Sequence, residues 1–145
     1  EADLDFLAQG ETVTLVFDVT VTDNNGGFDT EQVTINITGS NDSPVLTVVD
    51  NTGSIAEGSA LSDSGSFTFA DVDQTNTATT SKTNVSASWS GGTLSGAQTT
   101  ALYNAFSIAP PSFSSNSGTI TWNYSILEAD LDFLAQGETV TLVFD

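Results

Sequence analysis

The stretch TVTLVFDVTVTDNNGGFDTEQVTINIT, residues 12–38, decides the expected fold of the chain. In its first half, Val13, Leu15 and Phe17 are each separated by one other residue, and the second half repeats this pattern. Such a period of two residues is typical of a strand with one buried face. The Asn-Gly step at 25–26 favours a tight turn because both residues accept positive φ. The stretch therefore predicts a β-hairpin.

Short strand-like runs separated by turn residues continue through the rest of the chain. Along the last run, Ile120, Trp122, Tyr124 and Ile126 share one face and predict an apolar side. Further strands are expected near 45–49, 67–69, 85–89 and 120–126, and a helical turn or two over 99–106. About seven short strands with turn-rich connections predict an all-β fold, namely a β-sandwich.

An exact internal repeat organises the chain. Residues 1–18, EADLDFLAQGETVTLVFD, recur unchanged at 128–145, an offset of 127 residues. Identity over this length indicates a tandem array of 127-residue repeats. We interpret 1–43 as the C-terminal strands of one repeat and 44–145 as the N-terminal and central part of the next. Residues 19–38 are then expected to complete the truncated sandwich, either by permutation within one molecule or by strand exchange into a homo-oligomer.

The composition excludes several classes of function. The 145 residues carry 19 acidic side chains against one Lys, Lys82, for a net charge of −18, and they include no His and no Cys. A Ser-His-Asp triad, a thiol nucleophile and a Cys/His zinc site are therefore ruled out. Nucleic acid is an unsuitable partner because it needs basic side chains, and no apolar run approaches the length of a membrane span. We expect no enzymatic activity.

The acidic residues form short clusters at expected loops and strand ends, with almost no basic partners. Closely spaced carboxylates supply the hard oxygen ligands that Ca²⁺ prefers, whereas Mg²⁺ rarely uses an all-protein cage. Two carboxylates facing each other across a cleft could instead form a glycosidase pair, but identity between repeats favours a structural role. The predicted Ca²⁺ ligands are Asp71 and Asp73, Glu128, Asp130 and Asp132 with their copies Glu1, Asp3 and Asp5, Asp23 and Asp29, Asn41 and Asp42, and Glu57.

DFLAQGETVTLVFDVTVTDNNGG followed by VTINITGSNDSPV closely resembles the VCBS-type repeats of giant bacterial adhesins of the repeats-in-toxin class. The resemblance implies a cadherin-like, immunoglobulin-like Greek-key sandwich that needs calcium. It also implies type I secretion and an extracellular location on the bacterial surface. Cadherin-like modules bind calcium between consecutive domains. The matching pieces here are Glu57, Asp71-Val72-Asp73, the 128–132 segment and the 41–44 linker, whereas Asp23 and Asp29 match no cadherin ligand.

The expected function is therefore that of a calcium-stabilised spacer. Adjacent repeats of the same chain are its partners, and the array holds a distal adhesive tip away from the cell for attachment and biofilm formation. Two other functions stay open at this stage: a module that binds a glycan or a host surface, and a repeat that associates with its own kind.

Overall fold

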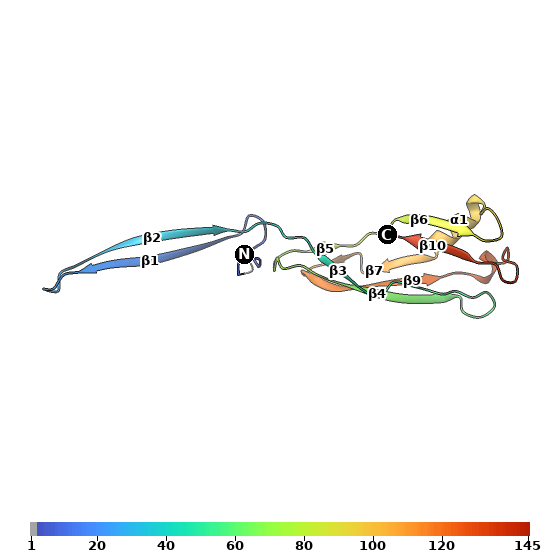
Figure 1. The fold of residues 1–145 in the computed structure, drawn as a ribbon, viewed down its shortest axis with the longest axis horizontal. Helices are drawn as coiled ribbons and strands as arrows, with labels where there is room; N and C mark the ends of the chain where they lie inside the picture. The colour runs from blue at the N-terminus through green and yellow to red at the C-terminus, as the bar shows by residue number, and fades with distance from the viewer. Residues whose placement is uncertain (1–2) are drawn as a thin grey trace.

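The computed structural model describes residues 3–145 and is elongated, with a hairpin projecting from one end of a packed body (Figure 1). The described residues form ten strands, one α-helix and one short 3-10 helix. These elements are β1 (Thr12–Thr22), β2 (Phe28–Thr38), β3 (Val45–Asp50), β4 (Ser62–Ala70), β5 (Ala78–Thr79), β6 (Asn84–Trp89), α1 (Gly96–Asn104), β7 (Phe106–Ala109), β8 (Ser112–Phe113), β9 (Ser117–Ser125), η1 (Glu128–Asp130) and β10 (Val140–Phe144).

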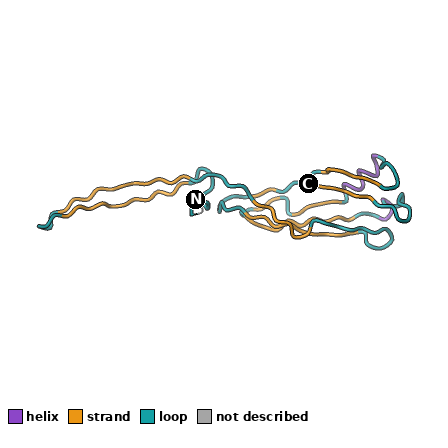
Figure 2. The backbone as a smooth tube through the Cα atoms, viewed as in Figure 1, coloured by secondary structure: helices purple, strands orange, loops and turns teal. Residues whose placement is uncertain are grey.

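The predicted hairpin is confirmed. Strands β1 and β2 pair in antiparallel register from Thr12↔Thr38 to Thr22↔Phe28. At the turn, the N–H of Asp23 donates to the carbonyl of Gly27 at 2.8 Å, and Gly26 has a φ of 88°. Glycine adopts a positive φ readily, which is why the Asn-Gly step predicted a tight turn at this point. The two strands run side by side well away from the rest of the chain (Figure 2).

The hairpin leaves its apolar face uncovered. Leu15 lies opposite Ile35 and Phe17 opposite Val33, so these four side chains share one face of the ribbon. All four are exposed, and Phe17 keeps 52% of its surface accessible. An isolated two-stranded hairpin is marginally stable in water, because it has nothing against which to bury such a face.

Residues 45–144 form the packed body, which agrees with a β-sandwich and confirms the all-β fold class. One antiparallel sheet has the order β3-β4-β9-β7, a second consists of β6 and β10, and β5 pairs with β8. Trp122 and Tyr124 of β9 are buried, as the alternation predicts, and Leu142 and Phe144 of β10 pack against them. The buried core residues are Leu102, Trp122, Tyr124, Ile126 and Leu131.

The helix begins earlier than the sequence suggested. Ser95 caps α1, because its hydroxyl accepts from the N–H of Gln98 while the Gln98 side chain accepts from the N–H of Ser95. Leu102 is its buried anchor. The helix ends at Asn104, close to the predicted end at 106, because Phe106 starts strand β7.

Lys82, the one basic side chain, packs against aromatic rings. Its Nζ donates to the carbonyl of Tyr103 at 3.1 Å and lies 5.4 Å from the ring centroids of both Phe106 and Phe144. The rings of Phe106 and Phe144 are themselves stacked, with centroids 4.1 Å apart. The lysine thus caps an aromatic stack through cation–π contacts.

The two copies of the repeated segment fold alike. In the first copy the N–H of Ala8 donates to Oε2 of Glu11 at 3.0 Å, and in the second Ala135 donates to Glu138 at 2.9 Å. The glycine inside each turn has nearly the same positive φ, 85° in the first copy and 88° in the second. The local fold of this segment is therefore encoded in its own sequence, whatever lies next to it.

Candidate functional site

The first copy and the linker after the hairpin pack against one end of the sandwich, and this junction is the candidate site. Gln74 donates its N–H to the carbonyl of Phe6 at 3.3 Å, and the Thr75 hydroxyl donates to Oε1 of Glu11 at 2.8 Å. Leu7 and Ala8 are buried there. The loop after β4 therefore receives residues from the part of the chain that we assign to the preceding repeat.

Asp73 lies at the centre of this junction and has no exposed surface. Its Oδ2 accepts from the N–H of Asp42 at 3.0 Å and from the side-chain amide of Asn76 at 2.9 Å. The N–H of Asp73 donates to Oδ1 of Asp71 at 3.0 Å. Its own Oδ1 is buried without a hydrogen-bond partner among the described residues. A buried carboxylate oxygen of this kind is costly unless a hydrogen-bond donor, a water molecule or a cation satisfies it.

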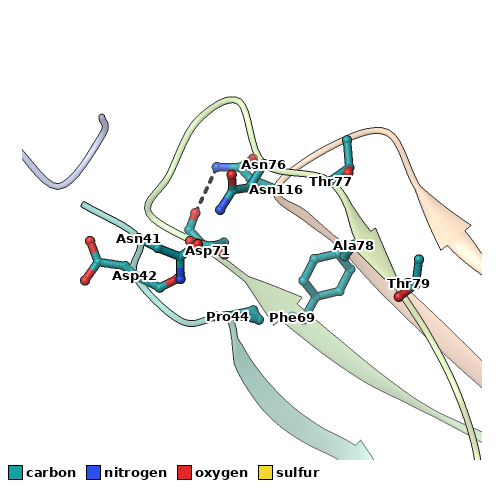
Figure 3. A pocket seen from close by; sticks show the side chains of 10 residues that line it. All are labelled: Asn41, Asp42, Pro44, Phe69, Asp71, Asn76, Thr77, Ala78, Thr79 and Asn116. Carbon is teal, nitrogen blue, oxygen red and sulfur yellow. Dashed lines mark hydrogen bonds between the residues drawn. The ribbon is translucent and has the colours of Figure 1, made fainter. Parts of the chain in front are cut away.

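A second pair of contacts fixes the loop that carries Asp71. The N–H of Asp71 donates to the carbonyl of Asn116 at 2.7 Å, and the Asn116 amide donates back to the carbonyl of Asp71 at 2.8 Å (Figure 3). A hollow of about 300 Å³ lies beside them, with Asn41 and Pro44 of the linker on its wall. The carboxylate of Asp42 points away from Asp71 in Figure 3, so what the linker presents to Asp73 is the Asp42 main-chain N–H.

The oxygen atoms that the junction offers as ligands suit a hard cation. Ca²⁺ takes carboxylate, amide and carbonyl oxygens, which Asp71, Asp73, Asn41 and Asn116 all carry. The partnerless Oδ1 of Asp73 is the atom that such an ion would satisfy. The described residues nevertheless bring no three acidic side chains close enough together to form a metal-binding group by themselves. An ion at this place would therefore need neutral oxygens as well as carboxylates.

The remaining predicted ligands lie in other parts of the chain. Glu57 and the 128–132 segment, which carries Asp130 and Asp132, lie at the other end of the sandwich. There, a Cβ added to Gly58 would lie 4.0 Å from Oε1 of Glu128. Asp23 and Asp29 lie at the tip of the hairpin, far from both ends of the sandwich (Figure 1). Asp3 and Asp5 belong to the first copy, and Glu1 lies outside the described residues.

Asp23 has a structural role in the turn. Its Oδ1 accepts from the N–H groups of Asn25 and Gly27, each at 2.8 Å. These main-chain donors lower the pKa of Asp23 below its ordinary value of 3.8. Asp29 likewise accepts from the N–H of Thr30 at 3.0 Å. Both carboxylates therefore have main-chain partners without a metal.

Sequence reasoning missed two polar residues of the junction, Glu11 and Asn116. Glu11 lies inside the exactly repeated segment, so its duplication as Glu138 was an available signal. Asn116 had none, because single asparagines are common in loops. Asp63 was also missed. It accepts from the N–H groups of Ser54 and Ser64, which lower its pKa below 3.8.

Comparison with protein-family models and with curated proteins finds no match to the chain. Within residues 3–145, none of the helices has the length and apolar character needed to cross a membrane.

Proposed function

We propose that this chain is a structural spacer module of an extracellular, surface-attached adhesin, and that Ca²⁺ at the junction between consecutive repeats stiffens the array. The observation that supports the proposal best is the buried Oδ1 of Asp73, which has no partner among the described residues. It lies where the linker meets the loop after β4, which is where an ion would fix the relative angle of two repeats. The neighbouring Asp71 and Asn41 offer further oxygens.

The net charge gives the ion a mechanical role. A chain with a charge of −18 repels its neighbours in an array, and its single lysine is held by a main-chain carbonyl and two aromatic rings. Binding a divalent cation between the linker and the 71–73 loop would neutralise part of this repulsion at the point of closest approach. The junction then resists bending because the linker and the 71–73 loop bind the same ion.

The proposed dependence of the junction on calcium also agrees with secretion of the chain. Extracellular calcium modules bind in the range of about 10⁻⁴–10⁻³ M, far above cytosolic calcium. A chain whose junctions need such concentrations stays loosely ordered inside the cell and becomes a rod outside. No catalytic step is required by this role, and the partners are the adjacent repeats.

Thermal unfolding tests the ion. We expect the melting temperature of the chain to rise with millimolar Ca²⁺ relative to chelator, and to rise less with Mg²⁺. Asp73→Asn keeps the shape of the side chain but removes its charge, and should abolish most of the calcium-dependent gain. Asp18→Asn changes the charge by the same amount on the exposed hairpin, where Asp18 accepts from Gln32, and should keep the gain. Equal melting temperatures with and without Ca²⁺ would overturn the calcium proposal.

Distance measurements between spin labels test the stiffening. The chain has no cysteine, so labels can be placed at Thr34→Cys on the hairpin and Ser64→Cys on the sandwich. A narrow distance distribution in Ca²⁺ that broadens in chelator is expected. An unchanged distribution, together with a raised melting temperature, would mean that the ion stabilises the sandwich without acting as a hinge lock.

A further inference from the structure

Leu4 and Phe17 in the first copy of the repeated segment are exposed, whereas their counterparts in the second copy pack in the core. Leu131 is 5% exposed inside the core, whereas its counterpart Leu4 is 45% exposed. Phe144 stacks on Phe106 in the core, whereas its counterpart Phe17 is one of the exposed residues of the hairpin. The strand that ends each copy thus has the same sequence but packs in a sandwich only in the second copy, whereas Leu7 and Ala8 of the first copy are buried at the junction.

Strand β10, at the end of the second copy, occupies the edge of β6. Strand β10 pairs with β6 from Val140↔Trp89 to Phe144↔Asn84, and its outer edge has no strand partner among the described residues. Because residues 12–18 repeat residues 139–145, β1 can pair with β6 in the same register and with the same side chains facing the core. Replacing β10 by β1 would therefore preserve every pairing that β6 now makes.

The hairpin also brings a strand that β10 lacks. An open groove of about 1150 Å³ lies between the two sheets, and Leu46 and Phe67 line it together with residues of β10. Leu46 and Val48 of β3 are exposed because the β6-β10 sheet is too narrow to cover them. Strand β2, hydrogen-bonded to β1, would widen that sheet to three strands. Val33 and Ile35 would then lie over the groove.

The linker is too short for a hairpin to complete its own sandwich. Seated beside β6, β2 would end near Val140, whereas β3 starts at Val45, opposite Ala70 and at the other end of the body (Figure 1). The nine residues of β4 separate those ends by about 27 Å, and the two sheets lie about 10 Å apart. Residues 39–44, fully extended, span at most about 25 Å from Thr38 to Val45.

We propose that the β1–β2 hairpin of one molecule inserts into the sandwich of a second copy of this chain, where its residues 12–18 take the place of 139–145. The hairpin already projects along the long axis of its own molecule, so the acceptor sandwich lies end to end with the donor sandwich (Figure 1). The contact is heterologous, and it leaves one donor hairpin and one acceptor edge open. Chains therefore grow head to tail by β-strand addition. This assembly does not depend on calcium.

Solution mass tests the assembly. We expect the weight-average mass in sedimentation to rise with concentration to at least twice that of the monomer. Ile35→Asp places a charge on the face that would enter the groove, and should hold the chain at the monomer mass. Thr34→Asp places the same charge on the opposite face of β2 and should assemble like the wild type. A monomer at all concentrations for the wild-type chain would overturn the proposal.

Disulfide trapping tests the register and does not depend on the fold of the aspartate variants. Ser88 lies opposite Thr141, whose copy is Thr14, so a chain with Ser88→Cys and Thr14→Cys should give a ladder of covalent oligomers on oxidation. The pair Ser88→Cys and Thr141→Cys reports the unexchanged state and gives a bridged monomer. A bridged monomer from Ser88→Cys with Thr14→Cys, or free thiols in an assembled sample, would overturn the exchange.

Discussion

The main-chain N–H of Asp42 donates a 3.0 Å hydrogen bond to Oδ2 of Asp73, a carboxylate with no exposed surface. This bond ties the linker after the hairpin to the loop after β4. It makes the orientation of the two parts of the chain depend on a buried acid.

The amide of Asn76 is the second donor to Asp73, and its removal should destabilise the junction. Asn76→Ala is expected to lower the free energy of unfolding by about 1–3 kcal/mol, the usual cost of leaving a buried polar group without its partner. Asn76→Asp should cost more in the presence of chelator, because a second carboxylate would face Asp73, and it should recover more on addition of Ca²⁺. Urea titrations of the two variants, with and without Ca²⁺, measure both effects. Equal responses to Ca²⁺ would contradict an ion at Asp73.

Gly39 allows the linker to approach the first copy closely. A Cβ at this position would collide with the main-chain carbonyls of Leu7 and Ala8. Gly39→Ala should therefore lower the free energy of unfolding by about 1–3 kcal/mol, because backbone atoms cannot move aside cheaply. Gly96→Ala at the start of α1 is the matched control, since a Cβ there has open space, and it should be neutral or stabilising. Urea titration of both variants compares them directly.

Tyr124 should make the fold sensitive to alkali. Burial, with a smaller contribution from the negative charge of Asp130, raises the pKa of the Tyr124 hydroxyl to about 12, against 10.0 for a free tyrosine. The folded chain thus holds this proton more tightly than the unfolded chain. The corresponding stability is complete below pH 10 and is lost as the pH rises towards 12.

Ultraviolet absorbance of tyrosinate follows this titration. Asp130→Asn should lower the pKa of Tyr124, yet leave it above 10 because burial is the larger cause. Asp29→Asn on the hairpin tip should leave it unchanged. A Tyr124 that titrates near 10 in the wild-type chain would show that its ring is not buried in solution.

Trp122 should contribute far more to stability than Trp89. Its ring is buried, its indole N–H donates to the carbonyl of Asp50 at 2.6 Å, and Gly65 leaves space for it. Trp122→Ala is expected to cost about 3–5 kcal/mol, as for other large buried side chains. Trp89 is half-buried at the edge of the core, so Trp89→Ala should cost clearly less. Denaturation followed by circular dichroism measures both, and equal losses would contradict the packing described here.

The sequence predicted local features well. The alternation around Leu15 and the Asn-Gly step located the hairpin, and the alternation through Trp122 identified the buried face of β9. Both features depend on neighbouring residues along one strand, so the period of two residues is enough to reveal them. The start of α1 was missed because its signal is a single capping serine, Ser95, rather than an apolar repeat.

Long-range features could not be read in the same way. Nothing in Asp71-Val72-Asp73 says that the second carboxylate is buried and the first is not, because that difference depends on where the linker and Asn116 are placed. The exact repeat likewise fixed the local fold of both copies but could not say which copy a sandwich covers. That outcome is decided by contacts with β6, which is distant in sequence from the first copy.

The placement of Lys82 has a consequence for proteolysis. Proteases of trypsin specificity cleave after lysine or arginine, and this chain offers them a single bond, the one after Lys82. That side chain is half-buried and held over two phenylalanine rings with its amine on a main-chain carbonyl, so a protease must first detach it from these contacts. The fold therefore restrains the one point at which such a protease could cut, and cleavage there should be slower in the folded chain than in the unfolded chain.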